Sequence, residues 1–149
     1  MGALIGQEIH AIDSKGRVSI PSKMRKALEP DANETFIVTK GYDKCLFAYP
    51  LNEWKKKEEF FKKLDQNNPD HRFILRTFLP FCVEVKLDTQ QRIQLTKDLI
   101  EEADIKEKVK IIGILDHIEI WNPDNFSTYK NSRSESFEDI VAKAVSVAQ

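Results

Sequence analysis

The sequence predicts an α+β protein that is mostly β, in which two tandem copies of one small unit share a single core. Two observations carry this prediction: an internal repeat that covers most of the chain, and short stretches of alternating apolar and polar residues broken by turn residues. The chain has 149 residues, 41% hydrophobic and 32% charged, which is typical of a folded domain. One four-stranded copy cannot bury enough apolar surface alone, so we expect both copies to pack about a pseudo-twofold axis.

The repeat is clearest around two similar loops. The segment HAIDSKGRVSIPSKMRKAL is echoed further along by VKLDTQQRIQLTKDLIEEA. GYDKCLFAYPLNEW then matches GILDHIEIWNPDNF at a slightly shorter offset, so residues have been lost between the blocks, most simply in the loop EPDANE. The repeat pairs Asp13 with Asp88 and Arg17 with Arg92.

Each copy contains four short strands and one short helix. In the first copy, alternation runs to Asp13, turns and resumes in RVSIP, which predicts a hairpin. A helix follows in SKMRKALE with Ser22 as its cap, and two strands, TFIVTKG and CLFAYP, flank a turn at Asp43-Lys44. The second copy repeats this succession in RIQL, TKDLIEEA, KVKIIGI and HIEIWN, with its turn at Asp116.

Three further helices are predicted after these strands, and the last two have no counterpart in the repeats. LNEWKKKEEFFKKL predicts a helix with a strongly basic face that joins the two copies, PDHRFILRTFLPF a second short helix, and SFEDIVAKAVSVA a closing amphipathic helix. We therefore divide the chain into a first repeat at 6–54, connecting helices at 55–81, a second repeat at 82–126 and a C-terminal helix at 127–149.

Several functional classes are disfavoured by the sequence. The longest apolar runs are too short to cross a bilayer and the start lacks the regions of a signal peptide, so we expect a cytoplasmic protein with no membrane partner. Cys45 and Cys82 form no CxxC pair and lie near no histidine at metal-ligand spacing, which predicts reduced core thiols and no metal or other cofactor. The scattered histidines His10, His71 and His117 suggest no active site, and we expect no small-molecule substrate.

Charge is segregated along the chain, although the formal net charge is only -1. The segment from 13 to 26 carries five bases and one acid, whereas the tail after 131 is acidic. Binding to a polyanion must therefore come from this local segment rather than from the whole molecule. The five bases are Lys15, Arg17, Lys23, Arg25 and Lys26.

The first loop, IDSKGRVSIP, has residues suited to contacting DNA. Gly16 lets the backbone approach a surface closely, while Lys15 and Arg17 can point outward. An arginine can donate two hydrogen bonds to guanine O6 and N7 or bridge phosphate oxygens, and a lysine supplies a mobile charge for phosphate. Phosphate would repel Asp13, so we interpret it as the residue that shapes the loop, by accepting backbone N–H bonds or by orienting Arg17. By residue types alone, a plain solvated turn is the simpler interpretation.

The second loop, DTQQRIQLT, keeps the acid and the arginine as Asp88 and Arg92 but has Gln90 and Gln91 in place of the lysine and glycine. Without the lysine it lacks a phosphate contact, so we expect it to bind DNA through Arg92 more weakly than the first loop does. The alternative is that Arg92 is purely structural and only pairs with Asp88.

The other candidate residues can be explained by structural roles as well as by contact with DNA. Lys23 and Arg25 are secondary candidates for phosphate contact, and an exposed helix face explains them equally well. Aromatic residues at matching strand and helix junctions of the two copies are interpreted as core or subunit contacts rather than base-stacking platforms. These are Tyr49, Trp54, Trp121 and Phe126.

The doubled Asp-x-x-x-Arg loop, the stretch DSKGRVSIP, the stretch GYDKCLFAYP followed by a tryptophan, and the late IEIW together resemble the MraZ family, nearly from end to end. This family belongs to the swapped-hairpin superfamily of transition-state regulators such as AbrB and SpoVT. The resemblance implies two tandem AbrB-like units that share one pseudo-twofold β-barrel core, with flanking helices. It also implies a nucleoid-associated transcriptional regulator, expected to be a repressor, which binds repeated promoter elements of the division and cell wall gene cluster as a ring-shaped homo-oligomer.

Two alternatives remain open. An antitoxin-like or scaffolding member of the same superfamily would act through a protein partner, bound by the helices outside the repeats. A hydrolase or transferase could use Asp13 and Asp88 as paired carboxylates across the pseudo-twofold axis. The bases in each loop would hold both carboxylates ionised, which is unsuited to an acid pair, so we expect no enzymatic activity.

Overall fold

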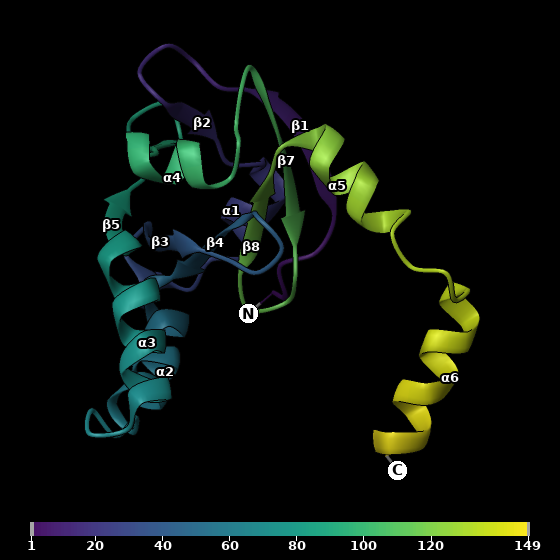
Figure 1. The fold of residues 1–149 in the computed structure, drawn as a ribbon. Coiled ribbons are helices and arrows are strands. Elements are labelled where there is room, and N and C mark those ends of the chain that lie inside the picture. The colour runs from purple at the N-terminus through teal and green to yellow at the C-terminus, as the bar shows by residue number, and fades with distance from the viewer. Residues whose placement is uncertain (1, 149) are drawn as a thin grey trace.

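The larger of two β-sheets has six strands, and every neighbouring pair in it is antiparallel (Figure 1). The computed structural model describes residues 2–148. In spatial order, the large sheet consists of β1 (Gln7–Ala11), β7 (Lys108–Gly113), β8 (Ile118–Trp121), β4 (Leu46–Pro50), β3 (Thr35–Lys40) and β5 (Val83–Lys86). The small sheet consists of β2 (Arg17–Ser19) and β6 (Arg92–Gln94).

Strand pairing relates the two copies by pseudo-twofold symmetry. β1 of the first copy pairs with β7 of the second, and β5 of the second pairs with β3 of the first, so each copy gives its first strand to the other. β4 pairs with β8 and β2 pairs with β6, each with its own counterpart. The predicted α+β fold, with two tandem swapped units around one core, is therefore confirmed.

Two details of the predicted fold are wrong. The large sheet is not closed into a barrel, because β1 and β5 form its two edges. The strands on either side of each Asp loop also do not form a hairpin with each other, because β1 and β2 both find their ladder partners in the other copy. β2 and β6 thereby leave the large sheet and form a separate ribbon, and the sheet stays open.

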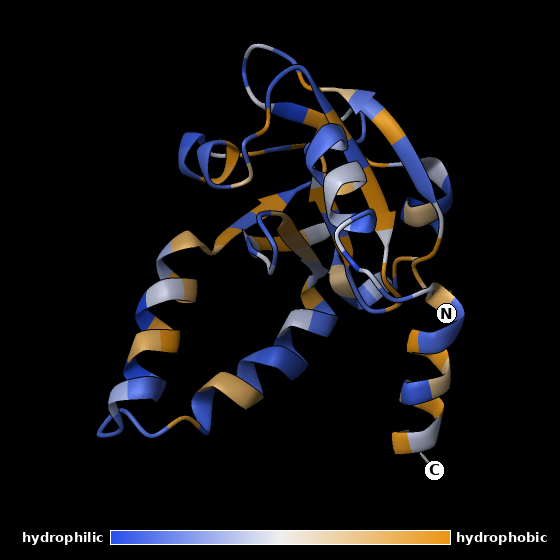
Figure 2. Ribbon diagram, turned by 45° about the vertical axis from the view of Figure 1, so that its right-hand side comes forward, coloured by the Kyte–Doolittle hydropathy of each residue, from blue (hydrophilic) through white to orange (hydrophobic). Residues whose placement is uncertain are grey.

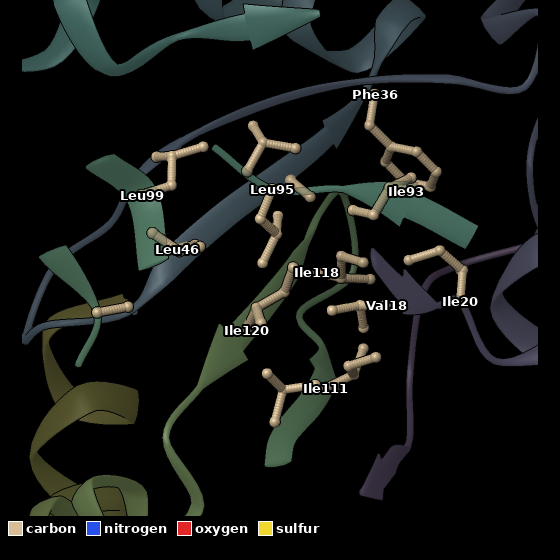
Figure 3. Close-up of a cluster of buried hydrophobic side chains, with 14 of the residues drawn as sticks. Val18, Ile20, Phe36, Leu46, Ile93, Leu95, Leu99, Ile111, Ile118 and Ile120 are labelled. Carbon is tan, nitrogen blue, oxygen red and sulfur yellow. The ribbon is translucent and has the colours of Figure 1, made fainter. Parts of the chain in front are cut away.

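The core lies between the large sheet and the β2–β6 ribbon (Figure 3). Alternation along β2 explains this placement, since Val18 is fully buried while Arg17 and Ser19 are half-exposed. The ribbon and its following helix contribute Val18, Ile20, Ile93, Leu95 and Leu99, and the large sheet contributes Phe36, Leu46, Ile111, Ile118 and Ile120.

Helices follow the strands in the same order in both copies. A short helix follows the ribbon strand, and a longer one follows the last strand. In chain order, the α-helices are α1 (Ser22–Lys26), α2 (Leu51–Lys62), α3 (Pro69–Phe78), α4 (Lys97–Glu102), α5 (Pro123–Lys130) and α6 (Phe137–Ala148), and the 3-10 turns are η1 (Pro30–Ala32) and η2 (Leu79–Phe81).

Helix starts show where sequence expectations held and where they did not. Ser22 is not a cap, because α1 begins at Ser22 itself and Pro21 holds the cap position without a side-chain acceptor. In the second copy the equivalent residue is Thr96, whose hydroxyl accepts the backbone N–H of Leu99 at 3.2 Å. Helix α5 was not expected, although Asn122 before a proline is a typical cap and accepts backbone N–H groups there.

The helices differ in how they join the body. α2 and α3 extend below the large sheet and diverge from the loop that joins them (Figure 2), while α6 stands away from the body on the other side (Figure 1). No helix within residues 2–148 is both long enough and apolar enough to cross a membrane. The repeat boundaries proposed above stay a prediction, and Gln149 of the last segment lies outside the described residues.

Because both copies build one core, a cavity in the ribbon should destabilise the whole chain. Ile93 is fully buried and faces Val18 across the β2–β6 ladder. We expect Ile93→Ala to lower the free energy of unfolding by about 2–5 kcal/mol, and denaturant unfolding followed by circular dichroism should keep a single transition. The control is Ile9→Ala on edge strand β1, where the side chain is 56% exposed. Separate transitions for the two halves would contradict the shared core.

Candidate nucleic-acid interface

The first loop is organised by the carboxylate of Asp13. Its Oδ1 accepts the backbone N–H groups of Lys15 at 3.0 Å and Arg17 at 2.8 Å, and its Oδ2 accepts Nε–H of Arg17 at 2.7 Å. The backbone N–H of Gly16 also bonds to the carbonyl of Asp13, at 3.0 Å. One carboxylate therefore fixes both the backbone turn and the direction in which the Arg17 side chain leaves it.

The second loop repeats this arrangement around Asp88. Its Oδ1 accepts the backbone N–H groups of Gln90 at 2.8 Å and Arg92 at 2.9 Å, and its Oδ2 accepts Nε–H of Arg92 at 3.0 Å. Gln91 holds a left-handed φ of 65°, a conformation in which side chains other than glycine are uncommon. The carboxylate bonds thus keep the loop shape although glycine is lost.

Gly16 serves packing inside the protein. It has a φ of +79° and is buried, and a Cβ placed on it would lie 2.8 Å from the carbonyl oxygen of Leu95. The sequence interpretation had it approach an external surface. The close approach in the structure is instead to the other copy, because the Gly16 carbonyl accepts the Leu95 N–H at 2.8 Å.

Contacts between the copies bring the two loops together. The Gly16–Leu95 bond has its pseudo-symmetric equivalent in the bond from Ile20 N–H to the Gln91 carbonyl, at 3.1 Å. Gln94 adds a side-chain bond to the Lys15 carbonyl at 3.0 Å. Arg92 Nη1 also lies 3.7 Å from Asp13 Oδ2, so the carboxylate of one loop is close to the arginine of the other. Lys15, Arg17 and Arg92 therefore belong to one continuous surface.

Electrostatics keep both carboxyl groups ionised. The pKa of Asp13 is lowered chiefly by the hydrogen bond from the backbone N–H of Arg17, with further lowering by the guanidinium. The pKa of Asp88 is lowered chiefly by the backbone N–H of Arg92. An acid pair requires one carboxyl group with a raised pKa, so both carboxyls are shifted in the direction opposite to that chemistry.

The terminal nitrogens of Arg17 remain available for a ligand, whereas Nη1 of Arg92 lies 3.7 Å from Asp13 Oδ2. Asp13 takes the Nε–H of Arg17, and Asp88 takes that of Arg92, so neither bond uses the terminal guanidinium nitrogens. Arg17 is half-exposed and Lys15 is exposed. A guanidinium anchored at Nε presents its remaining N–H donors in a fixed direction, which suits recognition of guanine or phosphate.

The two secondary candidates for phosphate contact, Lys23 and Arg25, differ in exposure. Lys23 is exposed on α1. Arg25 is half-buried and donates Nε–H to the Ile20 carbonyl at 3.0 Å, so part of its guanidinium stabilises the backbone where the ribbon ends. Gln94 was missed by the sequence analysis. Its counterpart in the first copy is Ser19, and nothing in the chain marks it as a bond between loops.

The aromatic residues at the strand and helix junctions lie in the interior. Trp54 and Trp121 are buried in a second cluster, with Phe126 packed against it. Cys45 is buried in the same cluster, and burial raises the pKa of its thiol. Within residues 2–148, no group of three or more His, Cys, Asp or Glu residues is arranged to hold a metal ion.

A family model described as "MraZ protein, putative antitoxin-like" matches residues 3–77 and 81–147. The chain belongs to the MraZ family. The two matched segments correspond to the two tandem repeats, which confirms the resemblance seen in the doubled Asp-x-x-x-Arg loop. MraZ is a regulatory, non-enzymatic family.

The lowered pKa values predict how this MraZ-family protein responds to acid. A carboxyl whose folded pKa is lowered adds stability above its unfolded pKa, about 3.9, and this contribution is lost as the pH falls through the folded pKa. We expect Asp13→Asn to be less stable than the unchanged protein at neutral pH, with the difference shrinking in acid. Urea unfolding at a series of pH values measures this. Asp31→Asn, at an exposed aspartate outside both loops, is the control. A difference that stays constant with pH would contradict a lowered pKa of Asp13 in the folded protein.

Proposed function

We propose that the protein is a sequence-specific DNA-binding transcriptional regulator, acting as a repressor of the division and cell wall gene cluster. The observation that carries the proposal is the joined pair of Asp-held arginine loops. Bonds between the two repeats fix both loops on one edge of the body. Asp13 holds Arg17 through Nε alone, so the terminal nitrogens of Arg17 can contact DNA, while Nη1 of Arg92 also lies 3.7 Å from Asp13. The family match supports a regulatory role.

The contact with DNA follows from the shape and charge of this edge. A major groove admits a two-stranded β-ribbon, and the loops are the ends of the β2–β6 ribbon. Arg17 donates to base edges or phosphate, Lys15 provides a charge for phosphate, and Arg92 makes the equivalent contact from the second loop. Asp13 and Asp88 do not touch DNA, since they hold the arginines from behind.

Useful affinity requires several copies acting together. One protein molecule offers three cationic side chains at its two loops, while the chain as a whole carries a net charge of -1. Linking copies raises the effective concentration of each further loop pair. A ring-shaped homo-oligomer bound to repeated promoter elements meets this need, and such a protein would associate with the nucleoid. Footprinting of promoter fragments tests it, because the spacing of protected elements reports the spacing of subunits.

Antitoxin-like action through a protein partner is the second candidate. It is favoured by large apolar side chains exposed outside the repeats, including Phe73 and Phe137 at 69% and 76% exposure. Under this hypothesis, the product of an adjacent gene would inhibit growth only in cells that lack the present protein. Growth assays with and without each neighbouring gene separate this function from promoter regulation.

We expect binding to duplex promoter DNA to depend strongly on Arg17 and on salt. Loss of one bidentate arginine contact costs about 1–3 kcal/mol, roughly five- to 150-fold per engaged loop, so Arg17→Ala should nearly abolish specific binding by an assembly of several molecules. Lys15→Gln should flatten the slope of log affinity against log salt by about one unit per engaged loop. Lys63→Ala, exposed just after α2, is the matched loss of charge outside the loops. Unchanged specific binding by folded Arg17→Ala would exclude the loop as the DNA contact.

The two loops should not contribute equally. Because Gln90 removes the lysine from the second loop, Arg92→Ala should weaken DNA binding less than Arg17→Ala does. A purely structural Arg92 predicts a different pattern: a lower melting temperature with little change in affinity. Measuring thermal unfolding and DNA binding on both variants distinguishes these outcomes. If Arg92→Ala were the more damaging to binding while the fold stayed intact, the second loop would be the principal reader of the sequence.

A further inference from the structure

Helix α6 is amphipathic, and within residues 2–148 no other element covers its apolar face. Its first turn is capped by Ser136, whose hydroxyl accepts the Asp139 N–H at 3.1 Å. Phe137, Val141 and Val145 recur every fourth residue and are 76%, 40% and 48% exposed. Figure 2 shows this apolar stripe on a helix that stands clear of the body. A stripe of this spacing is typical of a helix that binds in an apolar groove.

A groove of suitable chemistry lies between α2 and α3. It encloses about 710 Å³, and its apolar lining includes Leu79, which is 42% exposed. The packed aromatic pair Trp54 and Phe61 closes its floor from the α2 side. The apolar lining residues are Trp54, Phe61, Leu64, Leu75, Leu79 and Pro80.

Charge selects this groove over the other cavity beside α2. Lys62, Arg72 and Arg76 line the α2–α3 groove with one acid, Glu58. Lys62 is already paired with Glu59 at 3.3 Å and Glu58 at 3.7 Å, so the lining bases without an ion pair within residues 2–148 are Arg72 and Arg76. The first turn of α6 carries Glu138 and Asp139. The groove therefore attracts the charged end of α6 while taking its apolar stripe.

The second cavity beside α2, of about 610 Å³, has a lining whose charge disfavours the acidic first turn of α6. Three of its lining residues, Glu53, Asp116 and Glu119, are acidic. Lys56 pairs with Glu53 at 3.2 Å and Lys57 lies 3.9 Å from Asp116, so the two lining lysines are engaged with two of those acids. The acidic turn of α6 would meet a third acid there and no free base.

The helix and the groove lie on opposite sides of one molecule. In Figures 1 and 2, α2 and α3 leave the body on one side and α6 on the other. Both lie away from the loops that bear Lys15 and Arg17, at the top of the body in Figure 1. This arrangement therefore favours α6 of a second protein molecule as the occupant of the groove.

We propose that α6 of one protein molecule binds in the α2–α3 groove of the next molecule, head to tail. The contact is heterologous, so it closes into a ring or continues as a filament, and in a ring every copy makes it twice. The proposal rests on the proposed function in one respect: it supplies the link between copies that multivalent DNA binding needs. It also places the loops of all copies on the side opposite the linking helices.

Two charge insertions test the two halves of the contact. We expect Val141→Glu on α6 and Leu79→Glu in the groove each to weaken self-association at least a hundredfold, giving a monomer mass by light scattering after gel filtration. Both side chains are partly exposed in one copy, so each variant should remain folded by circular dichroism. Ser146→Glu, at an exposed position on the polar face of α6, is the matched control and should keep the mass of the unchanged protein.

Mixing the two defective variants gives the decisive result. Each retains one intact half of the contact, so an equimolar mixture should form a complex of two subunits and no larger species. The proposal is overturned if either variant keeps the unchanged protein's mass, if the mixture stays monomeric, or if the unchanged protein is itself monomeric at micromolar concentration. DNA binding by the loops is measured separately at low salt on the same variants. Loss of DNA binding by the unchanged protein would sink the proposed function while leaving the helix contact standing.

Discussion

The ladder between β2 and β6 is the constraint on which both the core and the loops depend. Each strand is only three residues long, so neither could hold its place without the other. Pairing them across the copies buries Val18 against Ile93 and completes the core above the large sheet. The same pairing determines where the chain enters and leaves each Asp loop. Core stability and loop placement therefore come from one contact, and neither can change without the other.

The pseudo-twofold symmetry is close in the backbone but incomplete in chemistry. Both loops keep the carboxylate that accepts two backbone N–H groups and one guanidinium Nε–H. What differs is the tip, where Lys15 and Gly16 of the first loop correspond to Gln90 and Gln91 of the second. Gln91 adopts the left-handed conformation that Gly16 adopts without cost, so the second copy keeps the loop shape at the expense of some strain. Because the second loop keeps the shape of the first but lacks its lysine, the two loops are suited to unequal contributions to one contact with a ligand.

Sequence patterns gave the elements and the repeat but not the partners of the strands. Alternation shows which side of a strand is buried, and it is silent on which neighbour completes the ladder. That is why β1 and β2 were expected to pair with each other. The misplaced cap has a simpler cause, since Pro21 occupies the position where Thr96 caps its helix. The role of Asp13 could be anticipated from charge, whereas the Gln94 bond to Lys15 depends on register across the copies.

The parts of the chain outside the repeats have a role that symmetry alone does not explain. A symmetric pair of units would be complete with its core and loops, yet α2, α3 and α6 extend away from both (Figure 1). On two of these helices large apolar side chains stay outside the core, because Phe73 on α3 and Phe137 on α6 remain exposed. Exposed apolar surface of this kind is costly to keep without a partner. Since the loops gain from being held in a fixed array, the helices and the loops can serve one purpose: the helices set the distance between copies, and that distance sets which spacing of DNA elements the loops can reach together.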